Sequence, residues 1–182
     1  DVLERHKIGK DASELEEILD IIASAVGSLT NPVRLSNTFD SEKQKKIDSE
    51  TIAKYLDYFK DAFLIDSALR YDIKGKKYIN TPLKYYFVDV GLRNAKLNFR
   101  QQEENHIMEN IIFNELKLRG FNVDVGVVEY NYKDKEGKSQ RSKLEVDFIA
   151  TMGNKKFYIQ SAWNIDSEEK RDQETKSLRR IN

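Results

Sequence analysis

Four positions in the carboxy-terminal half of this 182-residue chain correspond to the working groups of a metal-dependent hydrolytic site. Glu109 lies in a helical pattern, Asp147 lies in the strand-like run LEVDFIA, and Gln160 ends the run KFYIQ, two residues before Ala162. Cleaving a phosphodiester with Mg²⁺ requires carboxylate oxygens that hold the metal and a cation that stabilises the charge developing during attack. Glu109 and Asp147 supply two carboxylates for this chemistry.

The pattern written PD-(D/E)XK places an aspartate at the end of one strand and an acid and a lysine on the next. The acid and the lysine are two residues apart, so they share one face of the strand. Here the acid position is Gln160, which offers a carbonyl oxygen without negative charge, and the lysine position is Ala162. The sequence therefore predicts a vestigial site made of Glu109, Asp147 and Gln160, in which Asp147 and Gln160 would hold any Mg²⁺.

Structural roles stay open for the same residues. Glu109 is also interpretable as a surface acid of its helix, Asp147 as an acid of an edge strand, and Gln160 as a hydrogen-bonding residue of a strand. A displaced lysine, either Lys117 or Lys143, would restore the missing positive charge. An active nuclease with a rearranged site is therefore an alternative.

The elements that must position these residues are a helix, three strands and a second helix. Glu103 and Glu104 fit the first turn of the first helix, where negative charge is favourable, and Met108, Ile112 and Leu116 repeat at helical spacing. Residues 121–125, 144–150 and 156–160 have the composition of strands, and residues 167–181 form a charged helical pattern. This αβββα order is that of a restriction-endonuclease-like core, and we expect a further strand after Asn182, because Leu178 and Ile181 have no apolar partners.

The amino-terminal half predicts three helices followed by a β-hairpin. The first helix ends at Gly27, Asn31 and Pro32 begin the second, which runs to Phe39, and Asp48 caps the third. The third helix carries an apolar stripe, with a hydrophobic staple formed by Ile47 and Ile52. The stripe consists of Ile52, Leu56, Phe59 and Phe63. Alternation around the turn GKK indicates the hairpin.

Three helices and a hairpin form the arrangement called a winged helix, in which the third helix can enter the major groove of DNA. Lys54, Tyr55 and Tyr58 would then face DNA from the third helix. Three lysines of the hairpin would touch phosphates, and they are Lys74, Lys76 and Lys77. The fold class is therefore α+β, with a winged-helix segment at residues 1–92 and a carboxy-terminally incomplete nuclease-like domain at residues 93–182.

Composition limits what the chain can bind. It has 31 basic and 31 acidic residues, so its net charge is zero, and contact with DNA should be confined to local basic patches. It has no cysteine, which excludes disulfides and thiolate metal sites, and no run typical of a signal peptide or a membrane span. We expect a cytoplasmic protein. The run EGKS lacks the first glycine of a phosphate-binding loop, where Tyr132 stands instead, and predicts a turn.

Longer phrases of the chain resemble a known family. DVLERHKIG, YDIKGKKYINTPLKYYFVDVGLRNA, HIMENIIFNELKLRGFNVDVGVV, LEVDFIA and YIQSAW resemble the carboxy-terminal domain of unknown function behind the AAA+ module of a family of prokaryotic ATPases. The resemblance covers nearly the whole chain. It implies a P-loop ATPase before Asp1, a winged-helix segment and a PD-(D/E)XK-like domain. Relatives often read YIQV followed by alanine, which places alanine at the lysine position there too, so the resemblance is to a branch with a degenerate site.

These observations favour a non-catalytic, nuclease-like module with a winged helix that binds DNA or a partner protein and signals to an attached ATPase. This chain would need no cofactor of its own, because ATP would bind the preceding domain. The alternatives are an active metal-dependent DNA nuclease and a protein-interaction or oligomerisation domain, which the neutral charge and the tyrosine content favour. A homo-oligomer is a further expectation, because a half-covered sheet edge favours association with another chain.

Overall fold

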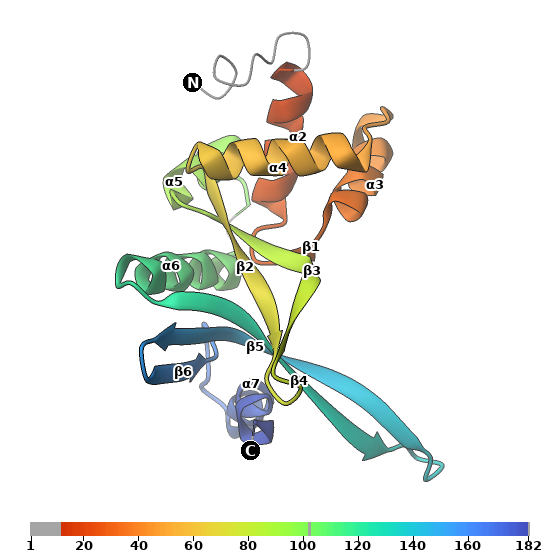
Figure 1. Ribbon diagram of the computed structural model, residues 1–182, viewed down its shortest axis with the longest axis vertical. Coiled ribbons are helices and arrows are strands. Elements are labelled where there is room, and N and C mark those ends of the chain that lie inside the picture. Colours follow the sequence, from red (N-terminus) through yellow and green to blue (C-terminus); the bar gives the residue numbers. More distant parts are fainter. Residues whose placement is uncertain (1–11, 102, 182) are drawn as a thin grey trace. The chain divides into compact units, whose positions relative to one another are not determined.

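The computed structural model describes residues 12–101 and 103–181 of the chain (Figure 1). The expected exit from a preceding domain, in residues 1–9, lies outside the described residues. The described helices are α2 Ala12–Ser24, α3 Pro32–Lys43, α4 Ser49–Asp61, α5 Val90–Lys96, α6 Glu104–Leu118, α7 Glu168–Thr175 and the 3₁₀ helix η1 Leu178–Arg180. The described strands are β1 Leu29–Thr30, β2 Ile65–Asp72, β3 Lys77–Phe87, β4 Asn122–Lys133, β5 Ser139–Met152 and β6 Lys155–Ile159. The chain is therefore a mixed α and β protein.

The chain forms two compact units, and both strands of the β2–β3 hairpin contribute residues to each. The first unit contains the described residues up to Ser67 together with Pro82–Asn110. The second contains Ala68–Thr81 together with the described residues from Ile111 onward. The hydrogen-bonded strands form one mixed six-stranded sheet in the order β1-β3-β2-β4-β5-β6. A division at residues 92 and 93 stays a prediction.

Three helices and the β1–β3 pair supply most of the core of the first unit. The side chain of Asn31 accepts a hydrogen bond from the Arg34 N–H at 2.8 Å, and Pro32 occupies the first turn, so the predicted start of α3 is confirmed. Asp48 precedes α4 as predicted, but its side chain makes no capping hydrogen bond. Apolar side chains of α2, α3 and α4 are buried together, and they include Ile18, Ile22, Leu35, Phe39, Ile52, Leu56 and Phe59.

Two expectations about α4 were wrong. Tyr55, expected to face solvent or DNA, is only 5% exposed. It lies three residues after Ile52 and four before Phe59, so it shares their helix face and packs into the core. Phe63, expected to continue the buried stripe, is 78% exposed, because α4 ends at Asp61 and Phe63 has a φ of 56°. The buried face of α4 is therefore wider than the predicted stripe, and it ends sooner.

The β2–β3 hairpin turns where the GKK run predicted it. Asp72 ends β2, and its carboxylate accepts a hydrogen bond from the Gly75 N–H at 2.9 Å, which closes the turn before β3 begins at Lys77. β3 then continues to Phe87 and includes the apolar run KYYF. The short helix α5 follows, begun by Asp89, whose side chain accepts from the Gly91 N–H at 2.6 Å.

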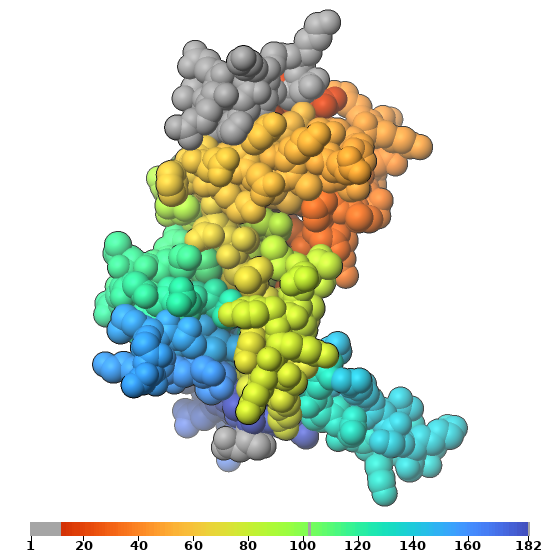
Figure 2. Space-filling view, viewed as in Figure 1, coloured from red at the N-terminus to blue at the C-terminus, as the bar shows by residue number. Residues whose placement is uncertain are grey.

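The second unit is built on the meander β4–β5–β6, which matches the three strands expected there. β4 pairs antiparallel with β5 from Asn122↔Thr151 to Lys133↔Ser139, and β5 pairs with β6. The far ends of β4 and β5, with their turn, project as a two-stranded arm (Figures 1 and 2). At its tip the Asp134 carboxylate accepts from the Lys138 N–H at 2.9 Å, so the EGKS run is a turn as predicted.

Candidate functional site

Asp147, the predicted metal-binding aspartate, is buried in β5 and already engaged by hydrogen-bond donors. The residue is 7% exposed, and its neighbours in the chain, Val146 and Phe148, are fully buried. The Oδ2 atom accepts hydrogen bonds from the Ser161 N–H at 2.7 Å and from the Ser161 hydroxyl at 2.8 Å. Burying a carboxylate without partners is costly, so these two donors stabilise the ionised group in place of a metal.

Gln160 is engaged in the same way by a donor that the sequence did not indicate. Its side-chain carbonyl oxygen accepts from the Ser177 hydroxyl at 3.1 Å, and Ser177 is 5% exposed in the segment between α7 and η1. β6 ends at Ile159, so Gln160 and Ala162 lie beyond the strand and strand alternation does not place them on one face. The amide therefore links β6 to the terminal helical segment.

Glu109, the predicted helix glutamate, belongs to the first unit, whereas Asp147 and Gln160 belong to the second. Its Oε1 atom accepts from the Lys84 Nζ at 2.9 Å and from the Tyr86 hydroxyl at 2.6 Å, and both partners lie on β3. The side chains of Lys84 and Glu109 are 5% and 10% exposed, so this is a buried ion pair. The three residues form a charged cluster inside the first unit.

The residues present do not fit a Mg²⁺ site of the expected kind. Within residues 12–101 and 103–181, no three histidine, aspartate, glutamate or cysteine side chains are placed to hold one ion together. Asp147 accepts from Ser161 and Gln160 accepts from Ser177, so both are held by hydroxyl-bearing residues. Lys143, a candidate for the displaced lysine, pairs with Glu129 at 2.9 Å. No metal-dependent step follows from this geometry.

The expected DNA-contacting residues of α4 offer little positive charge. Lys54 is exposed, Tyr58 is half-buried with its ring 6.3 Å from the Tyr55 ring, and Tyr55 is buried. The other exposed or partly exposed charges of this helix include Asp57, which pairs with Lys60 at 2.7 Å. The outward face of α4 therefore carries mixed charge.

The β2–β3 turn does present positive charge. Lys74, Lys76 and Lys77 are all exposed. The next residue, Tyr78, donates its hydroxyl to Asp124 at 3.2 Å, which attaches the start of β3 to β4 within the second unit. Burial, followed by Asp124, raises the pKa of the Tyr78 phenol, so Tyr78 stays neutral near pH 7 and the turn keeps its net positive charge.

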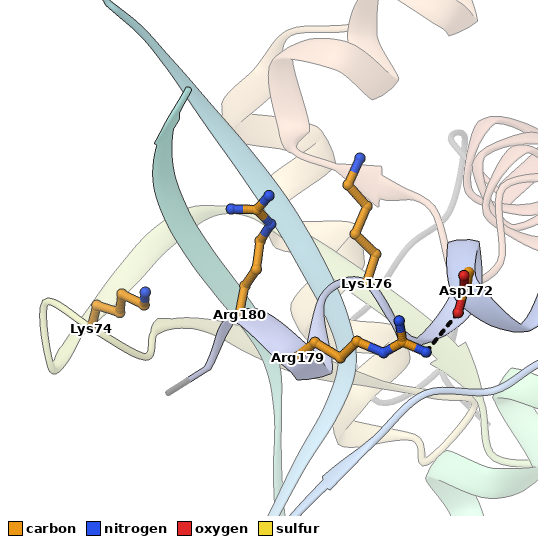
Figure 3. A pocket seen from close by; sticks show the side chains of 5 residues that line it. All are labelled: Lys74, Asp172, Lys176, Arg179 and Arg180. Carbon is orange, nitrogen blue, oxygen red and sulfur yellow. Dashed lines mark hydrogen bonds and ion pairs between the residues drawn. The ribbon is translucent and has the colours of Figure 1, made fainter. Parts of the chain in front are cut away.

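A basic hollow in the second unit contains further cations that sequence reasoning missed. Its volume is about 490 Å³, and four basic residues and one acid line it, namely Lys74, Lys176, Arg179, Arg180 and Asp172 (Figure 3). The spacing in KSLRRI indicated only a charged helix. Nothing in the sequence indicated that this segment would lie beside Lys74, because that contact depends on the tertiary fold.

Within the described part of the chain, no helix combines the length and apolar character that crossing a bilayer requires.

Comparisons with known proteins identify relatives in a bacterium and an archaeon. Over 88% of its length the chain is 38% identical to an uncharacterized protein of Haemophilus influenzae, of which it covers 37%. Over 93% of its length it is 30% identical to the uncharacterized protein MJ1544 of Methanocaldococcus jannaschii, of which it covers 35%. The chain thus spans little more than a third of these relatives. No solved structure matches it significantly. Residues 1–103, more than half of the chain, match the family described as "Domain of unknown function (DUF8612)", and the chain therefore belongs to that family.

Proposed function

We propose that this chain is a module of a P-loop ATPase that binds DNA and does not cleave it. The observation that carries the proposal is the state of Asp147, whose Oδ2 accepts two hydrogen bonds from Ser161 at 2.7 and 2.8 Å. In a nuclease this carboxylate would hold a metal ion instead. Gln160 is held by Ser177, and position 162 is an alanine. In this proposal the chain keeps the elements of a nuclease-like domain and lacks the acid and the lysine that cleavage requires.

The order of elements supports the two folds in this proposal. α2, β1, α3, α4, β2 and β3 follow one another as in a winged helix, with β1 antiparallel to β3. α6, β4, β5, β6 and α7 follow the αβββα order of restriction-endonuclease-like domains. Winged helices and nuclease-like domains both bind DNA, and the lysines of the β2–β3 turn supply an exposed cationic surface for phosphates.

The link to an ATPase rests on the resemblance of the long sequence phrases and on the greater length of the relatives. ATP would bind in that preceding domain, and this chain would report DNA binding to it. The reading frame upstream of Asp1 tests the link directly. We expect it to encode a GxxxxGK[ST] motif, and a frame that starts near Asp1 would overturn this part of the proposal.

A nuclease assay tests the absence of cleavage. Purified protein incubated with supercoiled plasmid in Mg²⁺ or Mn²⁺ should leave the plasmid intact, because two positioned groups are missing and each typically contributes about a hundredfold or more. Nicking by the unmodified chain that disappears in Asp147→Ala would show an active site at this position and refute the proposal. Nicking that persists in Asp147→Ala would indicate a contaminating nuclease.

A DNA titration tests binding and its location. If the three exposed lysines of the β2–β3 turn contact phosphates, they alone should contribute roughly −3 to the slope of the logarithm of the affinity against the logarithm of the salt concentration. Lys76→Ala with Lys77→Ala should flatten the slope by about 2. A matched control is Lys155→Ala with Lys156→Ala, two adjacent exposed lysines at the start of β6 in the same unit. Equal slopes for both double variants would exclude a role of the β2–β3 turn.

A further inference from the structure

The basic hollow of the second unit has an excess of positive charge, because four basic residues and one acidic residue line it. Arg179 pairs with Asp172 at 2.6 Å, and Figure 3 shows this contact while Lys176 and Arg180 extend away from it. Within residues 12–101 and 103–181, the side chains of Lys74 and Lys176 make no hydrogen bond or ion pair, although the Lys176 backbone N–H donates to the Gln173 carbonyl. The Asp172 carboxylate is thus the single negative charge among four cations in this hollow. Cations gathered in this way repel one another, and an anionic ligand would relieve that repulsion.

Arg180 is held in a geometry suited to phosphate. Its guanidinium carbon lies 4.1 Å from the centre of the Tyr130 ring on β4. A guanidinium lying over an aromatic face is attracted to the ring, and its N–H groups point outward from its edge. These donors form a planar fork that matches the oxygens of a phosphate. Tyr130 thus orients Arg180 without using its hydrogen-bond donors.

The shape of the surface favours an extended ligand. A second hollow, with a volume of about 520 Å³, also contains Lys74 and is lined in addition by Glu129, Tyr130, Asn131 and Arg141. The two hollows share Lys74, and Arg180 of the first lies over the ring of Tyr130 of the second. Cationic and polar groups therefore follow one another from η1 to the β4–β5 arm. A single small anion would use only one of these positions, whereas a chain of phosphates would use several.

We propose that this surface, formed by Lys74, Lys176, Arg179 and Arg180, binds the phosphate backbone of duplex DNA. The inference rests on the proposed function and assigns to Lys176 and to η1 a binding role that the nuclease-like pattern does not give them. Lys74 connects this surface to the other lysines of the β2–β3 turn, so the two form one footprint on the second unit. The contacts are to phosphates, so they add affinity without sequence preference.

Fluorescence anisotropy with a labelled DNA duplex of random sequence tests the inference at several salt concentrations. Lys176→Gln with Arg180→Gln should flatten the salt slope by about 2 and weaken binding roughly tenfold or more at low salt. The matched control is Lys170→Gln with Arg171→Gln, which removes one lysine and one arginine that are exposed on α7 and lie outside the hollow. Circular dichroism melts establish that both variants are folded.

The outcomes separate the inference from the proposed function. A flatter slope for Lys176→Gln with Arg180→Gln, beside an unchanged control, supports the inference. If both double variants bind like the unmodified chain while Lys76→Ala with Lys77→Ala weakens binding, the hollow is not part of the interface and the proposed function stands. If the unmodified chain does not bind DNA, both fail. Binding of sodium tripolyphosphate that depends on Arg180, without DNA binding, would assign the hollow to a small polyphosphate instead and overturn the inference.

Discussion

Replacing Lys84 by methionine should destabilise the first unit severely, because it leaves Glu109 charged in a buried position. Lys84 Nζ lies 2.9 Å from Glu109 Oε1, and the two side chains are 5% and 10% exposed. Methionine keeps most of the volume of the lysine stem and removes the ammonium group, so packing changes little. The Tyr86 hydroxyl, 2.6 Å from Oε1, would still donate to the carboxylate but carries no charge.

The expected loss is large relative to the stability of a domain. Removing one partner of a buried ion pair costs about 3–5 kcal/mol, because the other charge stays buried without compensation. A folded chain of this size is typically stable by roughly 5–15 kcal/mol, and each kcal/mol shifts the melting temperature by about 2–4 °C. Lys84→Met should therefore lower the melting temperature by roughly 6–20 °C.

Two further variants show whether the charge causes the loss. Lys84→Met combined with Glu109→Gln removes both charges and keeps an acceptor for Tyr86, so most of the stability should return. Lys60→Met is the matched control, because Lys60 pairs with Asp57 on α4 while the two side chains are 38% and 66% exposed, and its loss should cost under about 1 kcal/mol. Urea unfolding measures all of these variants. If the double variant is no more stable than Lys84→Met, or if Lys60→Met is equally destabilising, the reasoning is refuted.

Other predictions concern stability at high pH, close packing and the vestigial site. Burial, followed by Asp57, raises the pKa of Tyr85 to about 12, so the ionised phenol is disfavoured in the folded state and stability falls as the pH rises above the ordinary value of 10.0. The loss from this residue is on the order of 1 kcal/mol at pH 11, and Tyr85→Phe should remove this part of the loss in urea unfolding compared at pH 9 and 11; an equal loss in the variant would contradict the assignment. Gly126→Ala should cost roughly 1–3 kcal/mol in the same assay, because its Cβ would lie 2.8 Å from the Val146 Cβ, and an unchanged midpoint would show that β5 can move. Gln160→Glu with Ala162→Lys should leave a calorimetric Mn²⁺ titration flat, because both positions lie beyond β6 and Asp147 stays engaged by Ser161, and measurable Mn²⁺ binding would show that the three positions can form a metal site after all.

Local signals in the sequence predicted the elements that depend on local chemistry. Asn31 and Pro32 located the start of α3, and the polar runs around Gly75 and Gly137 located two turns, because caps and tight turns are specified by neighbouring residues. The short helix α5 was missed, although Asp89 is a capping residue placed two positions before Gly91. Its seven residues carry too little periodicity to separate it from an apolar strand.

Contacts between distant segments could not be predicted in this way. The acid at Glu109 was found, but not its partner Lys84, which lies 25 residues earlier on β3. Asp147 was found as a buried acid in an apolar run, but its hydrogen bonds to Ser161 depend on how the chain leaves β6. The basic hollow combines Lys74 with Arg180, and only the fold of the second unit brings them together. The sequence therefore identified the candidate residues from local spacing, but it did not identify the residues that each of them contacts.

The division of the chain into two units has a consequence for any attempt to separate them. The chain passes from one unit to the other after Ser67, after Thr81 and after Asn110, so neither unit is a continuous stretch of sequence. A fragment ending at residue 103, where the family match ends, would lack Asn110, whose amide group makes two hydrogen bonds to the Phe87 backbone. It would also lack Glu109. Such a fragment should not fold by itself, and a single protease cut should not release either unit as an independent piece. A fusion or deletion that keeps either unit folded must therefore keep both units, because each is completed by segments on either side of the other.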